Sequence, residues 1–576
     1  MAAKSRTVHA SERGTVQIGI NMMVVSTPST YITSKGLSEV TGEEISKIEH
    51  FGVHKQRLPT LSQSNVTMVA DAIYLFIKRV SAWPDMEKKF FKELPKAIYF
   101  GTESNDDYSR PEAAPALGMT ISRLLNEDAE KYKRYANALK NIEIKQVTFA
   151  CAGGGLSISD AVDSVYTAAS FGRNESAIVI TADTAVYNPR RARNAEKTQG
   201  SAAALMWITK NPELVDIKYS RGYGRFSMPL SDFTKFGNCT PIVHGEASNI
   251  GYVYAVAKAV EDLEAAYSAR APMGQSILES RIVPKQIGEM ISGIMHSVLK
   301  KINEKYEGLS FADLYAFISH VPYPKQAKEG AGYLFVHYLK RFNPKLYDQM
   351  QKRQDVGKDP LAGKRLTDLI TEKLSSFGGD AENGVISYLE SDKDIKEELK
   401  WIKKVMKQPE FGAFLNKLHI DDALDLPSKI GNSYTTSLPV ALASLLRKVS
   451  DQHHFGEHMI SRPAVLVFYG SGLVAKAFVV EIKATQKSRE HIIISTESES
   501  GGIELLPAAY TYLHSQLILG DAFRTITTND LTEQNRDLLG GKLPKGFNLV
   551  RRHSDGTWES VFVNGAGVPE PIRPRF

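Results

Sequence analysis

One structural unit occurs twice in this chain of 576 residues, and the repetition limits the folds that the chain can adopt. Each copy consists of a polar turn, a helix with one apolar face, a short apolar strand and a second polar turn. One copy surrounds Cys151 and the other surrounds Asn432. Buried strands that alternate with helices indicate an α/β fold, and two related halves would account for the repetition.

The first copy begins with the apolar run 147–150, which predicts a strand ending at Cys151. Apolar residues then recur every three or four positions, and Gly172 is placed to end the predicted helix. The run 177–182 predicts a second buried strand, which ends at Asp183. Two earlier strands are predicted at 16–25 and at 97–100, the latter ending beside Glu103.

The second copy has the same order of elements. Residues 311–318 predict a strand that ends next to His320. Asn432 then precedes two threonines suited to capping a helix over 438–446. The run 464–468 predicts the next strand, followed by the turn Tyr469-Gly470-Ser471-Gly472.

The composition excludes several classes of protein. Hydrophobic residues make up 42% and charged residues 24%, as in ordinary globular domains. No stretch approaches the roughly 20 apolar residues of a membrane-spanning helix. The net charge of +6 comes without a concentrated basic stripe, so nucleic acid is not an indicated partner. Residues 1–15 lack the apolar core of a signal peptide, and we interpret them as a short flexible arm.

The chain contains only two cysteines, Cys151 and Cys239, too few for a disulfide framework and typical of a reducing compartment such as the cytoplasm. Cys151 lies at a strand-to-helix turn, where the helix dipole and free N–H groups favour a thiolate. The glycines that follow would let a substrate carbonyl approach the backbone closely. The structural alternative is a small buried cysteine beside a glycine-rich packing turn. Cys239 matches no motif and is interpreted as structural.

Four other polar residues lie at predicted strand ends or helix starts: Glu103, His320, Asn432 and Ser471. In open α/β sheets ligands bind outside the carboxyl ends of the strands, so these side chains can converge. A nucleophile, an imidazole and a carboxylate are the groups that covalent acyl transfer with proton abstraction requires. Each also has a structural interpretation, as a surface turn residue, a strand-end histidine or a turn-former.

Seven sequence blocks are distributed over about 15–480: Gly101-Thr102-Glu103, Phe149-Ala150-Cys151-Ala152-Gly153-Gly154, Thr181-Ala182-Asp183-Thr184-Ala185-Val186-Tyr187, Asp232-Phe233 with Pro241-Ile242-Val243-His244-Gly245, His320-Val321-Pro322-Tyr323-Pro324-Lys325, Gly431-Asn432-Ser433-Tyr434-Thr435-Thr436-Ser437 and Tyr469-Gly470-Ser471-Gly472. In these blocks and in their order, the chain resembles the 3-hydroxy-3-methylglutaryl-CoA synthases of the thiolase superfamily.

The resemblance implies a thiolase-like α/β fold, in which two pseudo-repeated halves stack into a five-layered α/β/α/β/α core. We expect an N-terminal half at 15–215 that carries the nucleophilic cysteine and a C-terminal half at 216–480. A charged, mostly helical insertion at about 342–425 interrupts the second half. The segment 481–576 is a C-terminal extension that completes or decorates the core.

The resemblance also implies an acyltransferase that condenses acetyl-CoA with acetoacetyl-CoA and water to 3-hydroxy-3-methylglutaryl-CoA, in the mevalonate pathway that leads to isoprenoids. Cys151 would carry the acetyl group, and Glu103 would remove a proton from its methyl. His320 would hold the ketone oxygen of acetoacetyl-CoA and supply a proton. Backbone N–H groups at Cys151 and near Ser471 would stabilise the enolate.

Further site residues follow from the same motifs. The substrate-binding candidates are Asn432, Tyr434, Ser471, Gly472, Asp183, Asp232, Phe233 and Thr198. Lys325 and Lys328, one helical turn apart, are candidates for the CoA phosphates, with solvated surface lysines as the alternative. We expect no metal and no cofactor, since CoA thioesters are the substrates. Kinship also implies a homodimer and allows a complex with an acetoacetyl-CoA thiolase, with no nucleic acid and no membrane involved.

Two departures from the family pattern bear on specificity. Ala152 replaces the aromatic residue that often follows the catalytic cysteine, which predicts a wider acyl pocket. Glu196-Lys197-Thr198-Gln199-Gly200 replaces the family's Arg-Pro-Thr-Gly-Gly stretch, which affects local substrate contacts.

Three alternative functions follow from these observations. An enzyme of this kind could add an acyl group to a β-keto chain bound to a carrier protein. The chain could also be a non-catalytic, CoA-binding subunit of a thiolase complex, although its intact Cys, Glu and His argue against that. A decarboxylating ketoacyl-synthase-III-like enzyme ranks third, because His320-Val321-Pro322-Tyr323 stands where those enzymes carry His-Gln-Ala-Asn, and Glu103 would have no role.

Overall fold

The computed structural model describes residues 16–105, 111–188, 194–218, 223–228, 232–234, 241–270, 314–377, 384–451, 462–483, 486–495, 502–519, 539, 545–552, 558–564 and 569–572. The predictions made for 1–15, for 311–313 and for Cys239 lie outside these residues. Among the described residues, no helix combines the length and the apolar character needed to cross a membrane.

The strands of the first half form one sheet with both faces covered. In spatial order it contains β5 (Glu143–Val147), β4 (Leu94–Gly101), β6 (Glu175–Ala185), β7 (Gly200–Lys210) and β1 (Ile18–Ser26). β4 pairs in parallel with β5 and β6, and β7 runs antiparallel to β6 and β1. Every residue of β1 is buried, which explains why its sequence is apolar without alternation.

The second half forms a similar but smaller sheet, from β12 (Ala316–Ser319), β13 (Arg462–Gly470), β14 (Val474–Ile482) and β9 (Tyr223–Ser227). β12 pairs in parallel with β13, while β14 runs antiparallel to β13 and β9. β8 (Val215–Ile217) pairs with both β1 and β14 and joins the two sheets. It therefore straddles the predicted boundary between 215 and 216.

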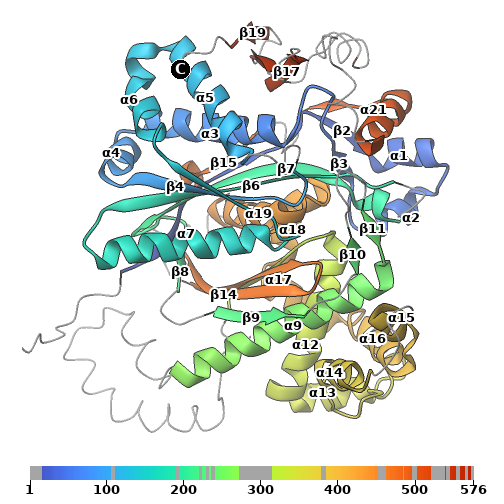
Figure 1. The fold of residues 1–576 in the computed structure, drawn as a ribbon. Helices are drawn as coiled ribbons and strands as arrows, with labels where there is room; N and C mark the ends of the chain where they lie inside the picture. The colour runs from blue at the N-terminus through green and yellow to red at the C-terminus, as the bar shows by residue number, and fades with distance from the viewer. Residues whose placement is uncertain are drawn as a thin grey trace, which may run out of the picture.

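Helices and sheets alternate in five layers (Figure 1). The outer layer of the first half contains α3 (Asn65–Ala82), α4 (Pro84–Lys92), α5 (Ala113–Glu127) and α6 (Ala129–Leu139). α7 (Gly153–Ser170) and α19 (Ser437–Asp451) lie between the sheets. α9 (Gly245–Arg270) and α12 (Pro324–Phe342) cover the outer face of the second sheet. The predicted fold is thereby confirmed.

The two halves repeat the same order of elements. In the first half α7 leads into β6, which lies beside β4; in the second half α19 leads into β13, which lies beside β12. Glu103 follows β4 and His320 follows β12, while Cys151 precedes α7 and Asn432 precedes α19. The repeated unit in the sequence therefore corresponds to a repeated unit in space.

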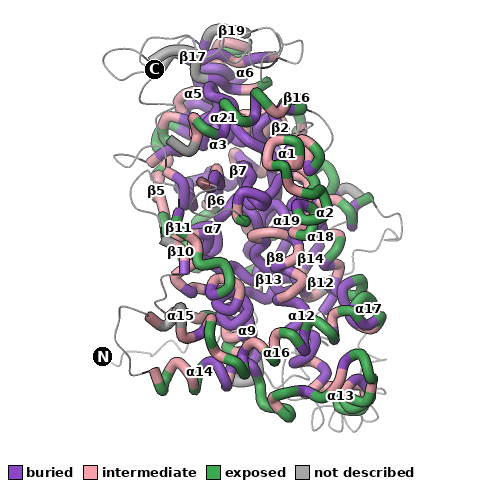
Figure 2. The backbone as a smooth tube through the Cα atoms, turned by 90° about the vertical axis from the view of Figure 1, so that its right-hand side faces the viewer, coloured by how far each residue is buried: buried purple, intermediate pink, exposed green. Residues whose placement is uncertain are grey.

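Two hydrophobic clusters fill the layers. The first lies between the first sheet and its outer helices and includes Phe76, Phe90 and Trp207, whose rings make edge and tilted contacts with one another. The second extends from the inner face of the first sheet through α7 and α19 to α9 and α12. Figure 2 shows the strands of both sheets buried, with exposed residues concentrated on peripheral helices such as α13 (Pro344–Gln351).

The charged segment within the second half is mostly helical where the structure describes it, with a non-helical stretch at 352–365. After α13 it contains α14 (Leu366–Ser376), α15 (Gly384–Ser391), α16 (Lys393–Val405), α17 (Pro409–Lys417) and α18 (Ile420–Ile430). Trp401 and Ile402 of α16 and Phe411 and Phe414 of α17 are buried in the second cluster. One face of this segment therefore packs into the core, and two of its carboxylates, Asp359 and Glu398, are buried beside Lys340.

The C-terminal extension packs against the first half. β15 (Ile492–Ile494) pairs in parallel with β1, and β16 (Ile503–Glu504) pairs in parallel with β2 (Thr30–Thr33), which in turn pairs with β3 (Lys55–Arg57). α21 (Pro507–Leu519) packs on α1 (Ser34–Thr41), close to α2 (Ile45–Glu49) in the view of Figure 1. β17 (Gly546–Arg552), β18 (Trp558–Val563) and β19 (Pro569–Pro571) form a small sheet over α3.

Two predicted strand ends are wrong by a few residues. The strand predicted at 147–150 shares only Val147 with β5, which ends there; Ala150 adopts a positive φ of 39°, which a strand cannot accommodate. β6 continues past Asp183 to Ala185, since β7 pairs with it as far as Gly200.

Candidate functional site

Cys151 lies in a tight turn between β5 and α7. The preceding Ala150 has its φ at 39°, a left-handed conformation that non-glycine residues rarely adopt. The turn is closed by two hydrogen bonds, from Ala152 N to Phe149 O at 3.1 Å and from Gly153 N to Ala150 O at 3.2 Å. Cys151 is buried, with 7% of its surface exposed, and α7 begins two residues later.

Cys151 and Glu103 are in direct contact. The thiol donates to Glu103 Oε2 across 2.9 Å, although the residues are 48 positions apart. β4 delivers Glu103 to this point, because its register beside β5 and β6 brings Gly101 level with Val147 and Thr181. Glu103 is itself buried, with 8% exposure. The carboxylate is thus placed to accept the thiol proton.

The prediction that Cys151 rests as a thiolate is opposed by its surroundings. Burial raises the pKa of the Cys151 thiol well above its usual range, and the negative charge of Glu103 raises it further. The helix dipole acts in the opposite direction, but it competes here with complete desolvation and a carboxylate in contact. We conclude that the resting form is a thiol that donates to a carboxylate.

The glycines after Cys151 allow α7 to pack closely against its neighbours. The predicted role was different, namely to let a substrate carbonyl approach the backbone. A Cβ on Gly154 would lie 2.6 Å from Thr435 O, and one on Gly155 would lie 2.4 Å from the Phe468 ring. One on Gly153 would lie 3.0 Å from Val147 O. α7 therefore approaches its neighbours so closely that side chains are excluded on this face.

Ala152 also packs against protein. A Cβ on Gly470 would lie 2.8 Å from the Ala152 Cβ and 2.6 Å from its nitrogen, and Ala152 is 2% exposed. The small residue at position 152 therefore fits the close approach of the β13–β14 turn. The expectation that it widens the acyl pocket has no support in this geometry.

Asp183 holds three segments of the site together. Its Oδ1 accepts from the Glu103 backbone at 2.7 Å, from both N and Oγ of Ser104 at 2.8 and 2.7 Å, and from Thr102 Oγ1 at 3.0 Å. Its Oδ2 accepts from Thr435 N at 2.9 Å and from the Thr435 hydroxyl. Because both oxygens are occupied, the geometry assigns Asp183 to positioning Glu103 and not to the predicted substrate contact.

His320 follows β12 and is fully enclosed. Burial lowers the pKa of its imidazole to about 3, so the ring is neutral at physiological pH. Ser437 Oγ lies 2.6 Å from Nδ1 and accepts from Val321 N at 3.3 Å, which leaves the hydroxyl proton for Nδ1. The imidazole proton is then on Nε2, which has no hydrogen-bond partner among the described residues. His320 thus offers one N–H to a ligand.

A cage of aromatic rings surrounds Cys151. The cysteine packs in one apolar cluster with Tyr187 and Tyr434, and Phe233 packs against this cluster from β10 (Phe233–Thr234), which pairs with β11 (Ile242–Val243). The Tyr434 ring makes edge contacts with Tyr187 at 6.1 Å and with Phe233 at 6.0 Å between centroids. Tyr434 also has a strained φ of 42°, so the backbone is constrained to direct this ring.

Asn432 connects this cage to the first half. Its Nδ2 donates to Tyr187 Oη at 3.1 Å, its Oδ1 accepts from Tyr434 N at 3.0 Å, and its backbone N donates to Thr198 O at 2.6 Å. Thr198 lies in the 3-10 helix η1 (Ala195–Thr198), and its hydroxyl donates to Ala195 O at 2.8 Å. Both predicted substrate-binding residues therefore have protein partners for the groups named.

Asp232 supports the turn that contains Ser471 and Gly472. Its Oδ1 accepts from Gly472 N at 3.0 Å, and its Oδ2 accepts from Tyr469 Oη at 3.4 Å. Burial raises the pKa of the Tyr469 phenol well above its usual range, and the negative charge of Asp232 adds to the effect. The Tyr469 ring lies 6.0 Å from that of His320. The Tyr469 side chain therefore lies between Asp232 and His320 and links these two parts of the site.

The two predicted CoA-binding lysines differ in their surroundings. Both lie in the first turns of α12, next to α2 and α18. Lys325 Nζ contacts His50 Nε2, and burial lowers the pKa of this amine. Lys328 forms an ion pair with Asp421 Oδ1 at 2.7 Å. A phosphate at Lys328 would compete with Asp421, which makes Lys325 the better candidate.

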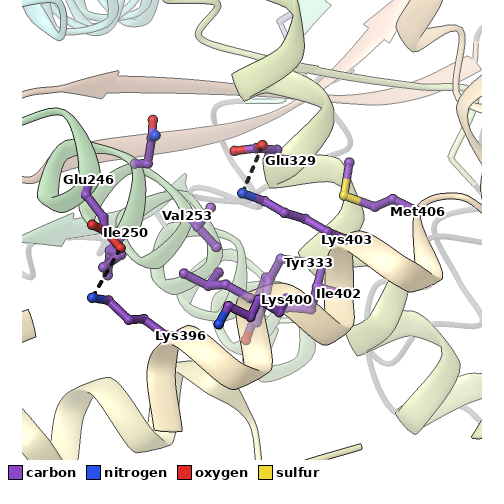
Figure 3. Close-up of a pocket in the computed structure, with 12 residues that line it drawn as sticks. Glu246, Ile250, Val253, Glu329, Tyr333, Lys396, Lys400, Ile402, Lys403 and Met406 are labelled. Carbon is purple, nitrogen blue, oxygen red and sulfur yellow. Dashed lines mark ion pairs between the residues drawn. The ribbon is translucent and has the colours of Figure 1, made fainter. Parts of the chain in front are cut away.

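A cavity of about 360 Å³ lies elsewhere, between α9, α12 and α16. Figure 3 shows it flanked by two ion pairs, Glu246–Lys396 at 3.8 Å and Glu329–Lys403 at 3.5 Å. None of its lining residues is a predicted site residue. We interpret it as the join between the helical insertion and the outer helices.

Several residues of the site were not singled out by their sequence positions. Tyr187, Ser104, Thr435, Ser437 and Tyr469 each hydrogen-bond to a predicted residue. Four of them belong to the motif blocks already quoted, but the motifs alone did not indicate what these residues do in the site. No group of three or more His, Cys, Asp or Glu that could hold a metal occurs among the described residues.

Comparisons with known proteins find similarity to hydroxymethylglutaryl-CoA synthases. The family described as "Hydroxymethylglutaryl-coenzyme A synthase C terminal" matches residues 361–501. A hydroxymethylglutaryl-CoA synthase of Haloferax volcanii is 25% identical over 473 residues, covering 82% of this chain and 83% of that protein.

Solved structures share the fold. MvaS in complex with 3-hydroxy-3-methylglutaryl-CoA aligns over 96% of this chain and all of its own, with a TM-score of 0.60 and 18% identity. The HMG synthase of the curacin biosynthetic pathway in complex with acetyl donor-ACP covers 95% of this chain and all of its own, with a TM-score of 0.61 and 13% identity. The predicted resemblance is confirmed, and so is the prediction of a condensing acyltransferase.

Proposed function

We propose, from the confirmed likeness to the hydroxymethylglutaryl-CoA synthases, that this chain condenses acetyl-CoA with acetoacetyl-CoA and water. The products are 3-hydroxy-3-methylglutaryl-CoA and free CoA. The observation that carries the proposal is the 2.9 Å contact between Cys151 Sγ and Glu103 Oε2. A thiol that shares its proton with a buried carboxylate can serve first as an acyl acceptor and then lie beside the base that activates the acyl group.

In the first step Cys151 attacks the thioester carbonyl of acetyl-CoA. Its proton passes to Glu103, and the C–S bond to CoA breaks as the bond to Cys151 forms. The CoA thiolate takes the proton and leaves as a thiol. Because the acetyl group is then joined to sulfur, the acetyl methyl is held close to the same carboxylate.

In the second step Glu103 removes a proton from the acetyl methyl, and the resulting carbanion attacks the ketone carbon of acetoacetyl-CoA. The neutral His320 donates its Nε2–H to the ketone oxygen as negative charge develops there. His320 gives this proton to the alkoxide, and the proton that Glu103 took from the methyl replaces it on the imidazole, so both residues end the step as they began. Water then cleaves the Cys151 thioester and restores the thiol.

The remaining expectations are part of the proposal. CoA thioesters are the only small molecules that these steps require besides water, and Lys325 at the start of α12 supplies a positive charge for their phosphates. The mevalonate pathway, a cytoplasmic location, a homodimer and a complex with a thiolase stay predictions. The absence of nucleic-acid and membrane partners is proposed from the composition.

Two measurements test the proposal. Purified protein is given acetyl-CoA alone, and its intact mass is recorded; we expect one added acetyl group, absent from Cys151→Ala. Acetoacetyl-CoA is then added, and free CoA is assayed. An unmodified protein would favour a non-catalytic subunit, while acetylation from an acetyl carrier protein only would favour the carrier-protein alternative.

A further inference from the structure

We infer that α21, from the C-terminal extension, is a positioning element of the active site: Tyr510 and His514 hold Gln199, and Gln199 sets Tyr187 and Asn432 for the second substrate. The inference rests on the proposed function and extends it. The helix lies at 507–519, beyond the stretch 361–501 that matches the family.

Gln199 is the centre of the arrangement. Its Nε2 donates to Tyr510 Oη at 2.7 Å, and Tyr510 Oη donates onward to Glu196 Oε1 at 3.1 Å. Its Oε1 lies 3.1 Å from His514 Nε2. Gln199 and Tyr510 are fully buried, and His514 is 6% exposed. The orientation of the amide is therefore fixed by two side chains of one helix, more than 300 positions away.

Gln199 also contacts Tyr187, one of the aromatic residues around Cys151. Its Oε1 also accepts from the backbone N of Tyr187 at 3.4 Å. Tyr187 Oη accepts from Asn432 Nδ2, so each step from α21 to Asn432 is a hydrogen bond between buried groups. Burial lowers the pKa of His514 to about 4, and a hydrogen bond to the Tyr187 backbone opposes the shift. His514 is therefore neutral and touches Tyr187 as well as Gln199.

The backbones around Gln199 and Asn432 are in close contact. Gln199 and Asn432 form an isolated β-bridge between the two halves of the fold. A Cβ on Gly200 would lie 2.3 Å from Ile430 O, and one on Gly431 would lie 2.0 Å from Gln199 O. Gly431 also has a φ of 90°, which favours glycine. Because there is no free space between these backbones, a change in the conformation of Gln199 would also displace the loop that contains Asn432.

α21 is held in place by apolar contacts in addition to this polar network. Leu505, Tyr510 and Leu513 pack in one cluster with Ile32 and Leu37 of β2 and α1. Removing a single hydroxyl from Tyr510 leaves its ring in this cluster. The positioning role can therefore be tested without detaching the helix.

The test compares Tyr510→Phe with Tyr512→Phe. Both remove one phenol oxygen from the same helix, but Tyr512 is 42% exposed and lies outside the network. We expect Tyr510→Phe to raise the KM for acetoacetyl-CoA by about tenfold, the effect of losing 1.4 kcal/mol of binding. The rate of Cys151 acetylation by acetyl-CoA should stay within about twofold of wild type, and Tyr512→Phe should match wild type in both.

A second pair separates positioning from simple stability. His514→Gln keeps an N–H donor for Gln199, whereas His514→Leu removes it. We expect His514→Leu to behave like Tyr510→Phe and His514→Gln to recover most of the wild-type KM, with melting temperatures of the two variants within a few degrees. Equal kinetics for the two His514 variants, or an unchanged KM in Tyr510→Phe, would overturn the inference. Failure of the proposed function is distinguished, because wild type itself would then show no acetylation or condensation.

Discussion

Cys151 Sγ donates to Glu103 Oε2 across 2.9 Å, and both side chains are more than nine-tenths buried. In the proposed function these are the nucleophile and the base, and they form one proton-sharing pair before substrate arrives. The carboxylate keeps the thiol protonated, and the thiol keeps the carboxylate directed at the point where the acetyl methyl will be. This pairing explains how a cysteine can be inert at rest and reactive toward a bound thioester.

Glu103→Gln should separate these two roles. Removing the negative charge lowers the Cys151 pKa, so we expect faster alkylation by iodoacetamide at pH 8 than in wild type. Condensation should fall by about 10²- to 10⁴-fold, the usual contribution of a general base. Mass spectrometry of the Cys151 peptide follows the first effect, with Cys151→Ala as the blank. Slower alkylation in Glu103→Gln would contradict the assigned direction of the pKa shift.

His320 should make stability depend on pH. Its folded pKa is about 3 and its ordinary value is 6.5, so the unfolded chain binds an extra proton between these values. The stability that a neutral His320 provides is present above pH 6.5 and is lost as the pH falls toward 3. Between pH 7 and pH 5 this loss should be about 2 kcal/mol.

Urea unfolding at pH 7 and pH 5 measures the effect, provided that the transition is reversible. His320→Gln should reduce the pH dependence by about that 2 kcal/mol. The control is His54→Gln, because the His54 side chain is 58% exposed. An identical pH dependence in wild type and His320→Gln would show that the buried histidine is not the titrating group.

Asp183→Asn should lower both the stability of the protein and its activity. The substitution replaces one of the two carboxylate oxygens by an NH2 group, which cannot accept a hydrogen bond. The buried donors at that position, either in the Glu103 loop or on Thr435, would therefore lose their acceptor. We expect a loss of about 3 to 5 kcal/mol in the free energy of unfolding, as for broken buried charged networks. Asp160→Asn on the exposed side of α7 is the matched control. A variant with full stability and no activity would instead indicate direct substrate contact.

Gly155→Ala should be destabilising, because the new Cβ would lie 2.4 Å from the Phe468 ring. Overpacking of this kind costs about 1 to 3 kcal/mol, which thermal unfolding detects. Gly245→Ala, at the start of α9, has open space around the added methyl and should be neutral or slightly stabilising. Equal melting temperatures for the two variants would show that α7 can shift to accept a side chain.

Lys325→Ala should weaken binding of CoA thioesters more than Lys328→Ala does, since Asp421 already pairs with Lys328. We expect the KM for acetyl-CoA to rise by about tenfold in Lys325→Ala, with kcat within about twofold, equivalent to 1.4 kcal/mol of uniform binding. Higher salt should reduce the difference from wild type. Lys393→Ala is the control, because this side chain is 85% exposed. A larger effect at Lys328 would reverse the assignment.

The sequence by itself determined which residues the proposed chemistry involves. A strand end fixes where a side chain emerges, and Glu103, Cys151, His320 and Ser471 all lie at such ends or at the helix starts beside them. Since parallel strands of one sheet share a carboxyl edge, their convergence could be anticipated from apolar runs alone. The repeated unit likewise predicted the stacking of two related halves, because each copy needs a second layer to bury its strands.

Tertiary structure decided the states and the tasks of these residues. The pKa of Cys151 depends on desolvation and on a carboxylate 48 positions away, and no local pattern contains either quantity. Asp183 was predicted to bind substrate, whereas six donors from the protein itself surround its carboxylate, and no sequence motif indicated a role for Tyr510 or His514. Burial and long-range hydrogen bonds arise only when distant segments pack, so the sequence names the reacting groups while the packed fold sets their protons and their orientation.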